Sequence, residues 1–288
     1  MSRLPITKTP KVYVGGAFIR SESARTYPLP DAAGNFFANI PQCTRKDLRN
    51  AVEAAAKAGP GWAKRTPYNR GQIIYRLGEM LEARKADLAD ALAIGGTSKS
   101  AAAKEIAATI DRLIHYAGWA DKYEQLLGNV NPVAAPYFNF TVTEPMGIVG
   151  VLAPEEAPLL ALVSLIAPAI TSGNTVVALA STSRPYPAIV LGEMLATSDL
   201  PGGVVNLLTG YRKEMVPTFA THTHLRAISG VASAEERQQL KQGAADSVKR
   251  VRLLKAEESV DWFSAKVEGL YEIRELIEFK TTWHPIGA

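Results

Sequence analysis

Residues 144–183 read EPMGIVGVLAPEEAPLLALVSLIAPAITSGNTVVALASTS, and most of the expected architecture follows from this stretch. Its two short apolar runs, Ile148–Leu152 and Thr175–Leu179, are rich in Val and bounded by Gly, Pro or Asn, which is typical of buried parallel strands. Residues 159–170 between them form one apolar segment of helical length. Strand, helix and strand at this spacing predict a right-handed βαβ unit, and therefore a parallel sheet with helices on both faces.

Composition and charge restrict the classes of protein to consider. The 288 residues are 47% hydrophobic and 21% charged, which suits one large globular domain or two small ones. The net charge is +4, and the densest basic group, residues 249–255, alternates with apolar residues, which favours a surface strand over a nucleic-acid-binding face. Neither a membrane span nor a signal peptide is expected. A single cysteine, Cys43, indicates no disulfide framework and favours a cytoplasmic protein.

Ahead of the βαβ unit, the sequence predicts a hairpin followed by a long helical region. The hairpin strands are expected at 11–19 and near 36–40, joined through turn residues. Thr44 followed three residues later by Asp47 indicates the capped start of a helix. Further helices are expected at 69–84, 85–94 and 100–118.

Behind the βαβ unit, strands and helices continue to alternate. The expected elements are a helix at 187–196, strands at 204–208, 225–228 and 248–254, an amphipathic helix at 260–279 and a terminal strand at 281–286. Ser233 with Glu236 forms a second capping box. The stretch from Tyr137 to Thr143 alternates aromatic or apolar residues with Asn and Thr, which favours an edge strand or hairpin arm.

Several sequence motifs, in their order along the chain, resemble those of the aldehyde dehydrogenase superfamily. They are EPMGIVGVLAP, APAITSGNTVV, LPGGVVNLLTG, YAGWADK and KTTWHPIG, and the resemblance covers about residues 12–254 and 269–285. It implies an α/β fold with a Rossmann-like parallel sheet, an N-terminal helical region and a small oligomerisation element made of a β-hairpin arm plus the C-terminal strand. The expected parts are the N-terminal hairpin and helices (1–135), the arm (136–145), the sheet with a C-terminal helix (146–279) and the oligomerisation strand (280–288).

The resemblance also implies a catalytic domain that this sequence omits. Complete family members carry it between the strand matching residues 248–254 and the C-terminal helix, where this chain has only residues 255–258. The family's nucleophilic cysteine, which attacks the aldehyde carbonyl, is lost with that domain. Cys43 is expected to lie in an N-terminal turn far from the nucleotide cleft, and is interpreted as a structural or surface thiol.

Two other catalytic positions implied by the family are also replaced. The oxyanion-binding Asn of a Pro-Trp-Asn-x-Pro turn corresponds to Glu156, an acceptor-only group where a donor is required. The general-base Glu corresponds to Leu254, so no catalytic residue is assigned. Glu155 and Glu156 form a possible acid–base pair, but adjacent residues in an extended turn point apart, and we interpret them as solvated carboxylates at a helix N-terminus.

The dinucleotide-binding positions implied by the family are altered as well. The ribose-binding Lys and Glu correspond to Leu179 and Thr182, and two family glycines correspond to Arg212 and Val216. The vestigial cofactor positions are Pro154, Glu155, Leu179, Thr182, Gly210 and Gly230. We therefore expect no cofactor, and NAD(P) is the one that the resemblance would imply.

The histidines give no metal site. His115 is expected to be a packed or surface imidazole, and His222 with His224 at the start of a strand lacks a third ligand. His284 lies in the terminal strand and is expected to pack at an interface.

Three hypotheses for function remain. The first is a catalytically inactive homologue, a pseudoenzyme, that assembles with a full-length aldehyde dehydrogenase as a structural or regulatory subunit, through the strand from Tyr137 to Thr143 and the tail from Lys280 to Gly287. The alternative is an NAD(P)-dependent aldehyde oxidoreductase subunit whose active site is completed by a partner chain. The third is a free-standing nucleotide- or metabolite-binding module with a redesigned cleft.

Overall fold

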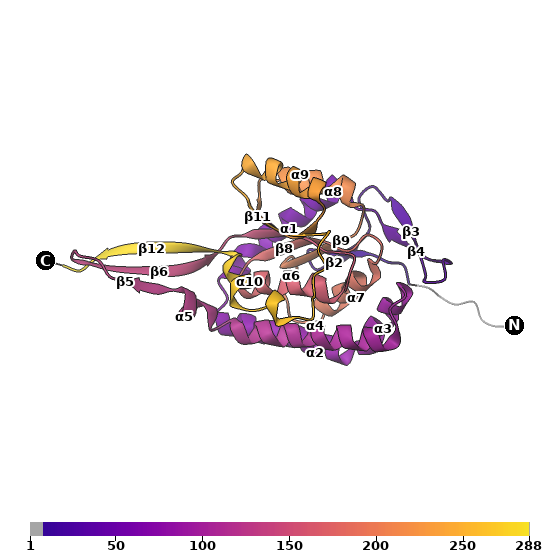
Figure 1. Cartoon of the computed structure of the whole chain (residues 1–288), viewed down its shortest axis with the longest axis horizontal. Coiled ribbons are helices and arrows are strands. Elements are labelled where there is room, and N and C mark those ends of the chain that lie inside the picture. Colours follow the sequence, from indigo (N-terminus) through magenta and orange to yellow (C-terminus); the bar gives the residue numbers. More distant parts are fainter. Residues whose placement is uncertain (1–7, 288) are drawn as a thin grey trace.

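The computed structural model describes residues 8–287, which form an α/β body with a projecting arm (Figure 1). The body contains a seven-stranded sheet in the order β11-β10-β7-β8-β9-β1-β2, in which β7 to β11 are parallel. Its strands are β1 (Val12–Val14), β2 (Ala17–Ile19), β7 (Ile148–Leu152), β8 (Thr175–Leu179), β9 (Val205–Leu208), β10 (Leu225–Ala232) and β11 (Arg250–Lys255). The predicted parallel sheet is confirmed. The polar segment at residues 1–7 and Ala288 lie outside the described residues.

Helices cover both faces of this sheet (Figure 1). On one face lie α1 (Arg45–Ala63), α8 (Arg212–Thr221) and α9 (Ala234–Ala245). On the other face lie α6 (Leu160–Thr171) and α7 (Tyr186–Leu195), covered by α2 (Pro67–Ala83), α3 (Lys85–Ile94) and α4 (Lys99–Trp119). Among the helices of residues 8–287, none has the length and apolar character needed to cross a membrane.

Burial on both faces explains why the central strands are uninterrupted apolar runs. In β7, Val149 and Val151 belong to the cluster under α6, whereas Ile148 and Leu152 belong to the cluster under α1 and α8. All residues of α6 are buried, because this helix lies between the sheet and the outer helices. Both predicted capping boxes, at Thr44 and at Ser233, are present.

The N-terminal region differs from the single hairpin that the sequence predicts. Residues 11–19 already form a complete hairpin, because Gly15 (φ 62°) and Gly16 (φ 85°) make a two-residue turn between β1 and β2. The later segment forms a separate two-stranded sheet of β3 (Thr26–Pro30) and β4 (Phe36–Pro41). The prediction was wrong because the Gly-Gly pair is itself the hairpin signal.

The predicted helix at 260–279 is also wrong in extent. The structure has a 3₁₀ turn at Ala265–Val267, a short helix α10 (Leu270–Arg274) and strand β12 (Ile277–Pro285). Gly269 has φ 110°, which interrupts the helix. The apolar residues of this segment pack into the main core individually, and Trp262, Ile273, Leu276 and Ile277 are its buried members.

Arg112 of α4 joins this C-terminal segment to the body. Its side chain is 3% exposed, and it donates to Ser164 Oγ (2.7 Å) and to the carbonyl oxygens of Trp262 (3.0 Å) and Val267 (3.1 Å). Its Nε lies 2.6 Å from Oε2 of Glu268, an ion-pair contact rather than a linear hydrogen bond. One buried guanidinium therefore connects α4, α6 and the segment after β11.

The arm is a three-stranded antiparallel sheet that extends away from the body (Figure 1). It follows α5 (Tyr123–Leu127) and consists of β5 (Asn129–Asn131), β6 (Tyr137–Pro145) and β12, with β6 in the centre. Strand β12 pairs with β6 along its whole length, from Ile277 opposite Pro145 to Pro285 opposite Tyr137. The two segments predicted as an arm and a tail are thus neighbours in one sheet.

Candidate functional site

The order of the parallel strands locates the place where a ligand would be expected. The chain runs from β7 through α6 to β8 and β9 on one side, then returns through α8 to β10 and β11 on the other side of β7. The strand order therefore reverses between β7 and β10. In open α/β sheets, ligands bind in the crevice outside the carboxyl ends of the strands at such a point. We call this place the switch-point crevice.

Arg212, the first residue of α8, spans the switch-point crevice. Its Nη1 donates to the carbonyl oxygen of Ala153 (3.0 Å), directly after β7, and its Nη2 donates to that of Val231 (2.7 Å) in β10. Nε and Nη2 also bind the two carboxylate oxygens of Glu236 at 2.8 and 2.9 Å. The guanidinium thus links the ends of two neighbouring strands to the first turn of α9.

Glu236 is held ionised by this contact. Burial raises the pKa of Glu236, but hydrogen bonds and positive charge from Arg212 outweigh burial and lower the pKa below its usual 4.5. Its Oε2 also accepts the backbone N–H of Ser233 (3.1 Å) in the capping box of α9. The carboxylate therefore serves both the helix and Arg212.

Glu155 closes the neighbouring part of the same edge. Its carboxylate accepts the backbone N–H groups of Thr182 and Ser183, each at 3.0 Å, and the hydroxyl groups of Ser181 and Ser183. It thereby joins the loop after β7 to the loop after β8. Our interpretation of Glu155 as a solvated carboxylate is wrong, whereas Glu156 is exposed as expected.

Because of these hydrogen bonds, the stability of the fold is expected to depend on the ionisation of Glu155. Burial raises the pKa of Glu155, but the bonds from Ser181 and Ser183 outweigh burial and lower it below its usual 4.5. A carboxyl with a depressed folded-state pKa stabilises the fold above pH 4.5, and this contribution is lost as the pH falls through the folded-state pKa.

We therefore expect Glu155→Gln to lower the free energy of unfolding by about 1–3 kcal/mol at pH 7, and to flatten its decline at acid pH. Urea unfolding between pH 7 and 3 measures both effects. Glu156→Gln is the matched control and should follow the wild type. Equal curves for the two variants would contradict this account of Glu155.

The remaining loops at this edge are tied together as well. The Thr182 hydroxyl donates to the carbonyl oxygen of Gly210 (3.1 Å), and the Tyr27 hydroxyl donates to that of Thr182 (3.2 Å). The rings of Tyr27 and Tyr211 lie 5.1 Å apart. Side-chain contacts therefore link the loops along the carboxyl edge of the sheet to one another, from β3 to α9.

Comparison with known proteins identifies the family of this chain. Residues 18–256 match the model of the aldehyde dehydrogenase family. The chain belongs to the aldehyde dehydrogenase family. Retinal dehydrogenase 2 of Gallus gallus is 33% identical over 253 residues, which cover 85% of this chain and 48% of that protein. An aldehyde dehydrogenase of Alternaria alternata is 31% identical over 248 residues, covering 84% and 49%. The chain spans about half the length of the curated relatives it matches.

Solved structures confirm the fold. The NAD⁺ complex of aldehyde dehydrogenase from Bacillus cereus matches with a TM-score of 0.81 at 25% identity, over 86% of this chain and 51% of that one. PnpE in complex with nicotinamide adenine dinucleotide matches with a TM-score of 0.82 at 25% identity, over 85% and 50%. The Rossmann-like α/β fold expected from the sequence is therefore shared with two proteins that were solved with a dinucleotide.

The family's cofactor positions do not form a dinucleotide site in this chain. Leu179 is fully buried in the core beneath α1 and α8, so its side chain does not face a ligand. Gly230 lies in β10 opposite Leu152 of β7, and a Cβ there would lie 2.2 Å from the Leu152 carbonyl oxygen, so the sheet itself requires a glycine at this position. Pro154 is buried, and the groups around it that face the crevice bind one another.

The two family positions assigned to catalysis carry no suitable group. Leu254 lies in β11 and packs against the core, so it offers neither a proton acceptor nor a donor. Glu156 is exposed beside the crevice.

Cys43 lies closer to this edge than the sequence suggested. Its backbone N–H donates to the Thr209 carbonyl oxygen (2.9 Å) directly after β9, so the expectation that it lies far from the cleft is wrong. The thiol is fully buried, and burial together with the nearby charge of Asp47 raises its pKa to about 12. A sealed, protonated thiol is not a nucleophile, and Cys43 is a structural residue.

The histidines take ordinary structural places. His115 accepts a hydrogen bond from Trp119 Nε1 (3.0 Å) on the outer face of α4. His222 caps the end of α8 rather than entering a strand, and its ring lies 5.9 Å from that of His224. Within residues 8–287, no group of three or more His, Cys, Asp or Glu residues is arranged to hold a metal ion.

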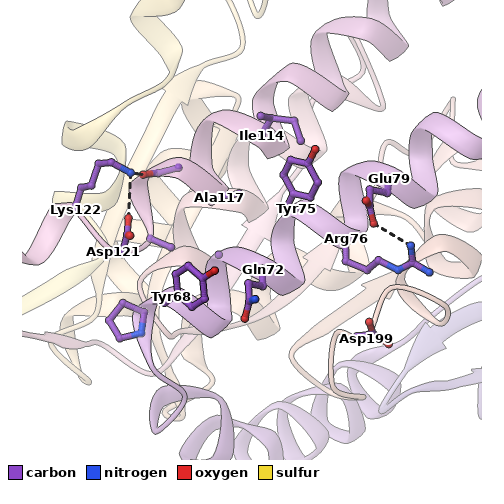
Figure 2. Close-up of a pocket in the computed structure, with 14 residues that line it drawn as sticks. Tyr68, Gln72, Tyr75, Arg76, Glu79, Ile114, Ala117, Asp121, Lys122 and Asp199 are labelled. Atoms are coloured by element: carbon purple, nitrogen blue, oxygen red, sulfur yellow. Dashed lines mark hydrogen bonds and ion pairs between the residues drawn. The ribbon is translucent and has the colours of Figure 1, made fainter.

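A groove on the outer helices is separate from the crevice (Figure 2). It has a volume of about 550 Å³ and lies between α2, α4 and the turn at Asp199. Its charged groups pair with one another, Arg76 with Glu79 at 2.9 Å and Lys122 with Asp121 at 3.1 Å. None of the predicted site residues lines it.

The sequence did not reveal the partners that close the crevice. Glu236 was recognised only as part of a capping box, and Ser181 and Ser183 were not singled out. Arg212 and Glu236 have opposite charges in the first turns of α8 and α9, which follow β9 and β10. Helices that follow neighbouring parallel strands begin at the same edge of the sheet, and this was the available signal.

Proposed function

We propose that this chain is a catalytically inactive member of the aldehyde dehydrogenase family, a pseudoenzyme that assembles with a full-length aldehyde dehydrogenase as a structural or regulatory subunit. The observation that carries the proposal is the projecting arm, which persists in a chain whose catalytic positions hold Glu156 and Leu254. We also propose a cytoplasmic location, because a single cysteine offers no disulfide framework.

The arm has the properties of an association surface. Strand β12 pairs only with β6 among the described strands, which leaves its other edge without a strand partner, and beyond Ile277 its residues are exposed or half-buried. Long exposed edges are templates for pairing with another chain. The arm also exposes large apolar side chains, namely Val130, Tyr137, Phe138, Val142, Phe279, Trp283 and Ile286. The register places these side chains on both faces of the arm, and so many exposed apolar side chains on one small sheet favour a protein interface.

A full-length family member suits this surface better than a second copy of the chain. In the family, the resemblance implies that the corresponding strands extend a sheet of the partner's catalytic domain. This chain joins β11 to its C-terminal segment directly and has no such sheet between them. The proposed interface therefore comprises β12, from Lys280 towards Gly287, and β6, from Tyr137 to Thr143.

The alternative function, an NAD(P)-dependent oxidoreductase subunit completed by a partner chain, requires an accessible dinucleotide crevice. The side chain of Arg212 across that crevice and the buried Leu179 favour the inactive subunit instead. The two functions differ in one measurable property, because only the alternative requires NAD(P)⁺ to bind this chain within the assembly.

Co-expression with a complete aldehyde dehydrogenase tests the proposal. We expect the two chains to elute together in size-exclusion chromatography and to appear together in native mass spectra. The double variant Phe279→Ser, Trp283→Ser should weaken association by about tenfold or more, because buried aromatic residues dominate interface energies. Tyr271→Ser is the matched control, since Tyr271 is 71% exposed on α10 and lies outside the arm.

Activity of the isolated chain provides the second test. Absorbance at 340 nm with an aldehyde and NAD⁺ or NADP⁺ should not rise above the rate without protein. Oxidation of any aldehyde by the chain alone would refute the proposed inactivity. A monodisperse monomer that ignores complete family members would refute the proposed assembly.

A further inference from the structure

We infer that Arg212, held in place by Glu236, is a built-in plug that closes the switch-point crevice and excludes a dinucleotide from this chain. The inference concerns the crevice of the isolated chain, and it is separable from the proposed assembly with another subunit. It rests on the position of the guanidinium, on the groups that fix it and on the charge around it.

The Arg212 guanidinium lies at the switch point of the sheet, where a ligand is expected to bind in an open α/β fold. Ala153 follows β7 and Val231 lies near the end of β10, the two strands between which the strand order reverses. Arg212 donates to both carbonyl oxygens, so its side chain bridges the opening rather than lining it. A ligand that enters between these strands must first displace it.

Several contacts oppose that displacement. The bidentate pair with Glu236 fixes two nitrogens, and the two carbonyl oxygens fix the guanidinium plane across the crevice. The Arg212 and Glu236 side chains are 18% and 21% exposed, so water screens their attraction less than that of a surface pair. Displacing Arg212 would leave the Glu236 carboxylate without its counter-charge.

The groups that normally attract a phosphate are already in use. Glu236 accepts the N–H of Ser233, and the Ser233 hydroxyl accepts the N–H of Glu236, so these N–H groups of α9 have protein partners. Arg212 balances the charge of Glu236, whereas Glu155 adds a carboxylate at this edge that would repel a pyrophosphate. Steric exclusion, hydrogen bonding and charge therefore all oppose the binding of a dinucleotide in the switch-point crevice.

The plug also has a structural role. A bound ligand in such a crevice contacts the ends of both strands and the helix behind them. Here Arg212 makes the connection between β7, β10 and α9 without a ligand. Removing it should therefore open the crevice and loosen these three elements together.

The experiment compares Arg212→Ala with Arg226→Ala. Both variants remove one arginine, but Arg226 is exposed at the start of β10, at the opposite edge of the sheet. Isothermal titration with NAD⁺ measures ligand binding, and hydrogen–deuterium exchange measures opening of residues 153–156 and 231–236. We expect about tenfold or more faster exchange in those segments for Arg212→Ala alone, and about tenfold or more tighter NAD⁺ binding when Glu236→Gln in the same chain also removes the carboxylate that Arg212→Ala leaves unpaired.

A third variant protects the test against a failure of Arg212→Ala to fold. Arg212→Lys keeps the positive charge but cannot make the forked contacts, so its exchange rates should lie between those of the wild type and an open crevice. The inference is overturned if the wild type binds NAD⁺ as tightly as the double variant Arg212→Ala, Glu236→Gln. It is equally overturned if the Arg212 variants match Arg226→Ala in exchange. A wild type that binds NAD⁺ yet still assembles with a full-length subunit would refute only this inference.

Discussion

An Arg112→Ala variant is expected to lose about 3–5 kcal/mol of folding free energy, because it removes three hydrogen bonds to largely buried groups and leaves the partly buried Glu268 carboxylate without its counter-charge. Arg112 donates to Ser164 and to two carbonyl oxygens of the C-terminal segment, and it contacts the Glu268 carboxylate. Small domains are stable by only about 5–15 kcal/mol in total, so the loss is large. Urea unfolding followed by circular dichroism measures it.

Arg76→Ala is the control for this prediction. Arg76 forms an exposed i, i+3 pair with Glu79, and such pairs contribute about 0–1 kcal/mol. If Arg112→Ala destabilises the chain no more than Arg76→Ala, the connection through Arg112 does not hold the C-terminal segment in place. Faster exchange of residues 260–276 in Arg112→Ala alone would locate the effect in that segment.

A Gly230→Ala variant is expected to lose about 2–6 kcal/mol, through a strained backbone and a steric clash in the centre of the sheet. Gly230 has φ 145°, a conformation that residues with a side chain rarely adopt. A Cβ would also lie 2.2 Å from the Leu152 carbonyl oxygen on the neighbouring strand. Strands β7 and β10 cannot separate locally, because both are buried between helix layers.

Gly118→Ala is the matched control for Gly230→Ala. Gly118 lies in α4, and a Cβ there would meet nothing within 4 Å. Alanine is the better helix former, so this variant should gain about 0.5–1 kcal/mol. Unfolding midpoints of the two variants should therefore move in opposite directions. A stable, fully folded Gly230→Ala protein would contradict the assigned geometry.

The central sheet is predictable from sequence because burial on both faces requires uninterrupted apolar strands. Ile148–Leu152 and Thr175–Leu179 were placed as strands with these bounds, and α3 was placed at 85–94. The capped helix starts are equally predictable, since a capping box needs residues only three positions apart.

The C-terminal segment was not predictable in the same way. Its apolar residues are spaced as in an amphipathic helix, but they contact α4, α6 and the sheet individually. Those contacts come from residues more than 100 positions away, such as Arg112 to Val267, so no local pattern reports them. Gly269 was the one local sign of a break.

The candidate site was predictable in position but not in its contacts. The resemblance placed Glu155, Thr182 and Gly230 at the carboxyl edge, and the fold agrees. It did not show that Glu155 binds the loop after β8, or that Arg212 reaches Glu236, because these pairs join loops after different strands. At a substituted position, the sequence shows which family residue is missing. It does not show the contacts that the replacing side chain makes.

Strand β6 can pair with β12 only late in the synthesis of the chain. Strand β6 ends at Pro145, and its neighbour β12 ends at Pro285, so the centre strand of the arm leaves the ribosome long before its partner. At about 5–20 residues per second this interval lasts roughly 7–30 s. During that time β6 has only the short strand β5 as a neighbour, so its other edge, next to Phe138 and Phe140, is open to pairing with another chain.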